Sequence, residues 1–194
     1  MSELNKIALK IISSGKGILA ADESNGTMTK RLSAVNLSST PEDRLLFRET
    51  VFSSESMKEC IGGVILYDET IKQKTSFGTS IPDLISSSGA VPGIKVDMGT
   101  KNLANSSEEK ITEGLDGLRE RLKKYYELGA RFTKWRGVYT INNTYPSKLA
   151  IHSNAHALAR YSALVQESKM VPIVEPEVLM DGNHSAEICL SKTS

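Results

Sequence analysis

Short apolar runs rich in β-branched residues alternate along the chain with longer stretches whose apolar residues recur at helical spacing. The runs predict five strands: GILAAD (17–22), IGGVILYD (61–68), PGIKVD (92–97), ARFTKWRGVY (130–139) and MVPIVEPEV (170–178). They start roughly 30–45 residues apart, which is the spacing of strand–helix units. Apolar strands joined by crossover helices predict an α/β fold with a parallel sheet buried on both faces.

Helical patterns fill the gaps between these runs. Residues 113–128 place leucine and tyrosine side chains on one side, and Gly129 is a suitable residue to end that helix. Residues 146–168 begin with a proline and a serine, which are typical of helix starts. Residues 1–17 form an amphipathic helical pattern without the apolar core of a signal peptide.

Charged residues stand near the C-terminal ends of four of the five predicted strands: Asp22, Lys95 with Asp97, Lys134 with Arg136, and Glu175 with Glu177. Within each pair the residues are two positions apart, so both side chains lie on the same face of a strand. Chance charges at frayed strand ends are the plain alternative, but three same-face pairs of both signs argue against it. Catalytic groups at the C-terminal ends of parallel strands are typical of a (β/α)8 barrel, the TIM barrel.

Composition narrows the class of protein without identifying its chemistry. Residues 1–194 suit a single domain or one large fraction of a bigger one, with 39% hydrophobic and 24% charged residues as in ordinary globular proteins. A net charge of +1 gives no electrostatic case for nucleic acid or an anionic membrane as partner. No window approaches the roughly 18 apolar residues of a bilayer span. Two distant cysteines, Cys60 and Cys189, favour a reducing cytoplasm.

The strand-end residues predict carbonyl chemistry. Lys134 beside Arg136 is crowded by a second cation, which favours a neutral, nucleophilic amine. Two carboxyl groups that stand together, such as Glu175 and Glu177, can serve as general acid and base near neutral pH. Further basic residues suit a phosphorylated substrate: Lys30, Arg31, Lys95 and Arg136. Together these features predict Schiff-base or enamine chemistry on a phosphorylated carbonyl compound.

The three histidines raise metal-dependent chemistry as an alternative. His152 and His156 are four residues apart on a predicted helix, as in some zinc sites, and His184 is the third histidine. No acidic residue stands between the first two, and no third ligand is placed near them in the sequence. We therefore expect solvated histidines and no metal.

Several longer blocks resemble the class I fructose-bisphosphate aldolases, in the same order and over the whole chain: GKGILAADES (15–24), KRL (30–32), CIGGVILYDET (60–70), GIKVD (93–97), GLDGL (114–118), KWR (134–136), LARY (158–161) and VPIVEPE (171–177). The resemblance implies a TIM barrel enzyme of glycolysis that reversibly splits fructose 1,6-bisphosphate into dihydroxyacetone phosphate and glyceraldehyde 3-phosphate. It also implies a cytoplasmic lyase without metal or other cofactor, and a homotetramer in the full-length form.

The resemblance also implies roles for individual residues. Asp22 is similar to the acid that handles the C4 hydroxyl proton during cleavage, and Lys134 to a lysine that steers charge and proton transfer beside the Schiff base. Glu175 resembles the acid–base group that dehydrates the carbinolamine, with Glu177 as its partner. Lys95 resembles a lysine near the substrate phosphate.

A loop after the first predicted strand resembles the segment of the family that lies along the substrate and its phosphates. Its matching residues are Ser24, Thr27, Lys30 and Arg31. Thr27 stands where the family pattern has a serine, so the hydroxyl is kept. Arg44 matches a helical arginine at the edge of the site.

The chain departs from the family in length. Five strands are predicted where the barrel has eight, and a complete barrel typically needs about 250 residues. In the family the sixth strand carries the lysine that forms the Schiff base, and no lysine of the 194 residues matches it. We therefore expect residues 1–194 to be the N-terminal part of an aldolase, inactive alone, with an aggregation-prone open sheet edge.

Two other interpretations stay open. A transaldolase-like Schiff-base barrel would act on a different sugar phosphate, and the substrate profile of a full-length form would separate it from an aldolase. A short, aldolase-derived interaction protein would be non-catalytic and would dock on an intact aldolase through the open sheet edge. Co-purification with a longer homologue would favour this last interpretation.

Overall fold

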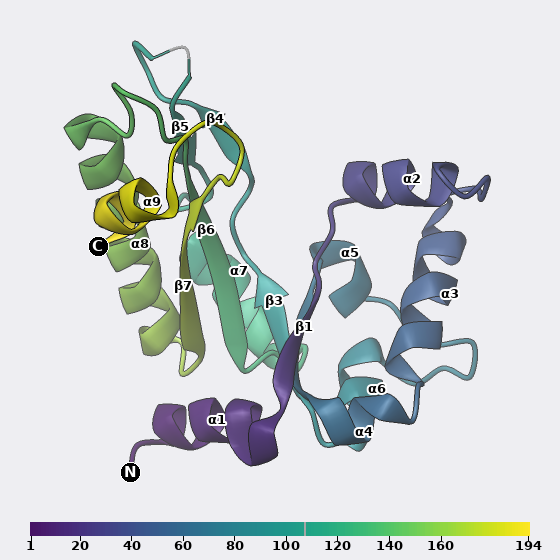
Figure 1. The fold of residues 1–194 in the computed structure, drawn as a ribbon. Coiled ribbons are helices and arrows are strands. Elements are labelled where there is room, and N and C mark those ends of the chain that lie inside the picture. The colour runs from purple at the N-terminus through teal and green to yellow at the C-terminus, as the bar shows by residue number, and fades with distance from the viewer. Residues whose placement is uncertain (107) are drawn as a thin grey trace.

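A parallel sheet of five strands, curved into half of a barrel, organises the chain (Figure 1). The computed structural model describes residues 1–106 and 108–194. The sheet order is β1-β2-β3-β6-β7, and every neighbouring pair is parallel. The strands are β1 (Gly17–Ala21), β2 (Ile61–Leu66), β3 (Val91–Lys95), β6 (Phe132–Tyr139) and β7 (Val171–Val178). The predicted α/β architecture, an incomplete TIM barrel, is confirmed.

Helices connect the strands, and all the packing helices but α1 lie on the outer side of the sheet in the contacts described below. They are α1 (Glu3–Ile12), the 3-10 turn η1 (Ser13–Gly15), α2 (Asn25–Ser33), α3 (Pro41–Phe52), α4 (Ser56–Cys60), α5 (Asp68–Ile71), α6 (Ile81–Ser87), α7 (Leu118–Glu127), α8 (Lys148–Glu167) and α9 (Ala186–Thr193). Helix α8 packs on β6 and β7, α6 on β3, and α4 on β2. Helix α1 contacts β1, β2, β3 and β7, so it lies against the inside of the half-barrel. None of the described helices is long and apolar enough to cross a membrane.

The larger core lies between the outer face of the sheet and the helices. Leu66, Ile94 and Trp135 leave their strands on this side and are fully buried. The Trp135 ring lies 5.3 Å from the Tyr161 ring of α8, measured between centroids. Alternation along β6 therefore places Lys134 and Arg136 on the opposite, inner face.

The inner face is apolar near the amino ends of the strands and charged near their carboxyl ends. Ile11 of α1 packs there with Ile65, Val91 and Phe132. The Phe132 ring lies where a neighbouring strand has no side chain, because a Cβ on Gly93 would stand 2.4 Å from the ring. This layer closes the bottom of the half-barrel and leaves the charged layer above it as the mouth.

A short antiparallel hairpin was not predicted. It pairs β4 (Thr100–Asn102) with β5 (Lys110–Thr112). It also explains why α7 begins at Leu118 and not at residue 113, since the chain reverses through Gly114 and Gly117, whose φ angles are +124° and +63°. The predicted start of the next helix is confirmed, because Ser147 caps α8 by accepting a hydrogen bond from the Ala150 amide.

Candidate active site at the carboxyl ends of the strands

Three predicted catalytic residues meet on the inner face of the half-barrel. Lys134 Nζ lies 3.3 Å from Asp22 Oδ2 and 3.1 Å from Glu175 Oε2. Lys134 comes from β6 and Glu175 from the neighbouring β7, whereas Asp22 follows β1 at the opposite edge of the sheet. The side chains of Lys134 and Asp22 are only 14% and 12% exposed, so solvent screens this contact weakly.

Lys134 is held as a cation. Burial alone lowers the pKa of its amine, but the carboxylates of Asp22 and Glu175 outweigh burial and raise that pKa above the ordinary lysine value. The expectation of a neutral amine beside Arg136 is therefore wrong. The Arg136 guanidinium lies 2.9 Å from Glu177 and is occupied by that carboxylate. The contacts with Asp22 and Glu175 favour the protonated form of Lys134, which is not nucleophilic.

The two glutamates of β7 have separate partners. Glu175 pairs with Lys134, and Glu177 pairs with Arg136 one layer nearer to the mouth. Both pairs are diagonal across the two strands, because the parallel register places Arg136 opposite Glu175 and Val138 opposite Glu177 along β6 and β7. The two glutamates therefore form two successive ion pairs along the strands, and each glutamate side chain is about one-third exposed.

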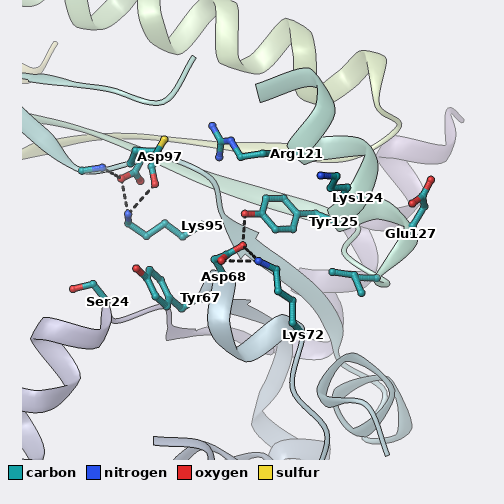
Figure 2. A pocket seen from close by; sticks show the side chains of 13 residues that line it. Ser24, Tyr67, Asp68, Lys72, Lys95, Asp97, Arg121, Lys124, Tyr125 and Glu127 are labelled. Atoms are coloured by element: carbon teal, nitrogen blue, oxygen red, sulfur yellow. Dashed lines mark hydrogen bonds and ion pairs between the residues drawn. The ribbon is translucent and has the colours of Figure 1, made fainter. Parts of the chain in front are cut away.

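Lys95 and Asp97 form a further ion pair after β3. The Lys95 Nζ to Asp97 Oδ1 distance is 2.5 Å, and the same oxygen accepts a hydrogen bond from the Gly99 amide at 3.0 Å. Lys95 and Ser24 also border a cleft of about 940 Å³ (Figure 2). Its opposite wall carries Tyr125 and other α7 side chains.

The cleft and the ion-pair cluster are different features of this face. Among the predicted site residues, only Ser24 and Lys95 line the cleft. The acid–base groups Asp22, Lys134 and Glu175 lie outside its lining. The candidate active site is the cluster, since it holds titratable groups in direct contact, and the cleft is open space beside two residues that were predicted to bind substrate.

The segment predicted to be a loop is helix α2, beyond the carboxyl end of β1 (Figure 1). Ser24 and Thr27 lie at its start, and Lys30 and Arg31 in its last turn. Ser24 caps the helix by accepting a hydrogen bond from the Thr27 amide, and the two hydroxyl groups lie 3.1 Å apart. Arg31 pairs with Glu23, although its side chain is largely exposed. Lys30 is exposed on the same helix. These hydroxyls and cations are accessible to an anionic ligand.

Arg44 differs from the expectation. Its side chain is only 8% exposed, its Nε and Nη2 atoms both donate to the Glu69 carboxylate, and its Nη1 atom donates to the Ser39 carbonyl. The hydrogen bonds to Glu69 raise the pKa of the Arg44 guanidinium. Every nitrogen that can donate is therefore directed into the protein, and Arg44 is not available at the edge of the mouth.

Sequence reasoning missed Glu69 and Arg48. Glu69 lies in α5, directly after β2, so the rule that found charged residues at strand ends could have found it. Arg48 gives no such signal, because an arginine within a helical pattern is most often a solvent-exposed residue. The structure buries it completely.

The histidines do not gather into a site. His152 and His156 are exposed on α8, and the His152 ring contacts the Lys148 carbonyl. Across residues 1–106 and 108–194, no three His, Cys, Asp or Glu side chains come together as metal ligands would.

Comparison with known proteins assigns the family. The model of the glycolytic class I fructose-bisphosphate aldolases matches residues 3–194. The chain belongs to this aldolase family. The cytosolic fructose-bisphosphate aldolase 6 of Arabidopsis thaliana is 51% identical over 98% of this chain and 53% of its own length. The non-muscle type aldolase of Lethenteron camtschaticum is 53% identical over 96% of this chain and 52% of its own.

A solved aldolase structure supports the same fold. The aldolase of Plasmodium falciparum, crystallised in complex with TRAP and a small molecule inhibitor, superposes with a TM-score of 0.95 at 46% identity. The match covers 97% of this chain and 55% of that one. The chain therefore spans about half the length of the curated aldolases it matches.

Proposed function

We propose that residues 1–194 supply the proton-transfer and phosphate-binding part of an aldolase site that reversibly cleaves fructose 1,6-bisphosphate. The products would be dihydroxyacetone phosphate and glyceraldehyde 3-phosphate. The observation that carries the proposal is the position of the Lys134 ammonium between the carboxylates of Asp22 and Glu175. Membership of the aldolase family supplies the reaction class.

The cluster suits each proton movement of a Schiff-base retro-aldol reaction. Glu175, in its protonated acid form, would give a proton to the carbinolamine hydroxyl, which leaves as water to give an iminium ion. Asp22 would then accept the C4 hydroxyl proton while the C3–C4 bond breaks and its electron pair moves to the iminium nitrogen. The products of this step are an aldehyde and an enamine. The Lys134 ammonium would stabilise the negative charge that develops on the C4 oxygen as its proton leaves.

The amine that forms the Schiff base is proposed to come from outside the described residues. The five strands carry only two lysines, Lys95 and Lys134, and each is paired with carboxylates. An amine whose pKa is raised is protonated at neutral pH and cannot attack a carbonyl group. We therefore propose that the 194-residue chain binds the sugar phosphate but does not turn it over alone.

The proposal extends to substrate binding, domain organisation, assembly and location. Ser24, Thr27, Lys30, Arg31 and Lys95 would bind phosphate groups, because hydroxyls and cations suit that anion. We propose that residues 1–194 form a single domain, since one continuous five-stranded sheet runs from β1 to β7. A homotetrameric full-length form and a cytoplasmic location follow from the resemblance, and two Arabidopsis thaliana relatives are named as cytosolic.

Two measurements on the 194-residue chain test this proposal. Calorimetric titration should show binding of fructose 1,6-bisphosphate, weakened by Lys95→Met and unaffected by Lys123→Met on the exposed side of α7. Borohydride reduction in dihydroxyacetone phosphate should leave no covalent adduct. An adduct on Lys134 or Lys95 would show that the nucleophile lies within this chain, and absence of binding would remove the phosphate-binding role.

A non-catalytic interaction protein is a second candidate. The observation in its favour is the outer edge of β7, which pairs with no other strand of the described sheet. Co-purification of the chain with a longer aldolase would support this function, and a monodisperse monomer that binds no longer homologue would exclude it.

A further inference from the structure

We propose that Arg44, Arg48 and Glu69 form a positioning network that holds the start of α2 against the end of β2 and so places Ser24 and Thr27 for a phosphate group. None of the three is a catalytic residue, since none belongs to the Asp22–Lys134–Glu175 cluster. The proposal rests on the proposed function for its ligand, but its contacts stand independently of that function.

The first arm of the network joins α3, α5 and α2. Arg44 of α3 donates Nε and Nη2 to the two oxygens of Glu69 at 2.8 and 2.6 Å. Asn25, the first residue of α2, donates its Nδ2 to the same carboxylate at 3.0 Å. Glu69 therefore bridges an arginine fork and the first helical residue after the Ser24 cap.

The second arm reaches the residue on the other side of Ser24. Arg48 donates Nη1 to the Thr70 hydroxyl at 2.7 Å and Nη2 to the Glu23 carbonyl at 2.8 Å. Its side chain is 1% exposed, and burial lowers the pKa of its guanidinium. The Glu23 carboxylate lies 3.7 Å from Nη2 and offsets part of the cost of burying this charge.

The two arms connect the same three helices, α2, α3 and α5. Arg44 and Arg48 are four residues apart, so they lie on one face of α3. Their acceptors Glu69 and Thr70 are consecutive in α5. On the other side, the arms hold residues 23 and 25, which flank Ser24.

The network holds the connection between β1 and α2 in place. Residues 22–24 carry the chain from β1 into α2, and a loop at this point would otherwise be free to rotate. The network links this connection to α5, which follows the neighbouring strand β2. Met28 and Leu32 anchor α2 by apolar packing. The polar contacts of the network have fixed directions, so they add a defined distance between the acid Asp22 and the hydroxyls proposed to bind phosphate.

Two substitutions separate the arms without removing either arginine. Asn25→Ala disconnects α2 from Glu69 and leaves the Arg44–Glu69 pair intact. Thr70→Val removes the α5 acceptor of Arg48 Nη1 at nearly constant volume and leaves the bond to the Glu23 carbonyl, and Thr70→Ser restores the hydroxyl. Ser33→Ala, exposed at the far end of α2, is the control because it contacts neither arm.

Hydrogen exchange of the α2 amides and affinity for fructose 1,6-bisphosphate should be measured on the 194-residue chain. We expect Asn25→Ala and Thr70→Val to speed exchange across residues 26–33 and to weaken binding by roughly threefold to tenfold, on the scale of one lost hydrogen bond. Thr70→Ser and Ser33→Ala should match the unsubstituted chain.

The outcomes distinguish this proposal from the proposed function. If thermal stability falls while α2 exchange and ligand affinity stay unchanged, the residues are merely structural and the positioning proposal is overturned. If the unsubstituted chain binds no sugar phosphate, the proposed function loses its binding role. In that case α2 exchange decides the network alone, since faster exchange in Asn25→Ala but not in Ser33→Ala supports it and equal exchange overturns it.

Discussion

Lys134 Nζ lies 3.3 Å from Asp22 Oδ2, although β2 and β3 separate their strands in the sheet. A flat sheet would hold these side chains about 14 Å apart, since neighbouring strands lie about 4.8 Å from each other. The contact therefore depends on the curvature of the half-barrel, which brings an inward side chain of β6 toward the end of β1. It also links residues 112 positions apart in the sequence.

Lys134→Met should destabilise the chain at neutral pH. The substitution leaves the carboxylates of Asp22 and Glu175 partly buried without their shared cation. We expect the free energy of unfolding at pH 7 to fall by about 1–3 kcal/mol, below the range for a fully buried pair because Glu175 is one-third exposed. Urea unfolding measures the effect, with Lys123→Met as control. Equal midpoints for all three proteins would contradict a structural role for the cation.

The contribution of Lys134 to stability should disappear only at high pH. Its pKa in the folded chain lies above the ordinary value of 10.5, so folding favours the protonated amine. This stabilisation is fully present below pH 10.5 and is lost as pH rises through the higher pKa of the folded state. The difference in unfolding free energy between the unsubstituted chain and Lys134→Met should therefore stay constant from pH 7 to 9. It should shrink only when the pH exceeds the pKa of a free lysine, 10.5. A difference that vanished between pH 7 and 9 would imply a lowered pKa.

The local elements followed from the sequence because each has a strong local cause. The β-branched runs fixed the five strands of the main sheet to within about two residues, and alternation placed Lys134 and Glu175 on one face. The hairpin was missed because its strands are three residues long and contain lysine and asparagine, which favour strands poorly.

The charge state of the site could not follow from the sequence. Lys134 and Arg136 stand two positions apart, which predicted a crowded and less basic lysine. In the structure Arg136 turns to Glu177, while Lys134 gains Asp22 through the curvature of the sheet. Both contacts are tertiary, so neither spacing nor composition predicts them. The burial of Arg44 could not be predicted for the same reason, because its partner Glu69 lies in α5, 25 residues further along the chain.

The Arg136–Glu177 pair should contribute little to stability. Its two side chains are 40% and 35% exposed, so solvent screens their attraction and ordering them costs side-chain entropy. A double-mutant cycle with Arg136→Met and Glu177→Gln should give a coupling energy of about 0.2–1 kcal/mol in the free energy of unfolding. A coupling well above that range would show that the upper layer of the mouth is less solvated than its exposure indicates.

Two prolines should limit pairing at the open edge of β7. Val171 and Leu179 donate their amides toward β6, so the odd-numbered residues between them face β6 and the even-numbered ones face outward. Pro172 and Pro176 occupy outward positions and remove two of the four amide donors that residues 172–178 could offer there. Replacing both with threonine should restore a continuous edge.

We expect Pro172→Thr with Pro176→Thr to increase self-association of the 194-residue chain, measured as weight-average mass by sedimentation equilibrium. Adding Val174→Lys to that variant should reverse the increase, because Val174 also has an outward amide and its exposed side chain would then carry a charge at the same edge. An unchanged mass in the proline variant would mean that α9, which contacts β7, already shields this edge from pairing.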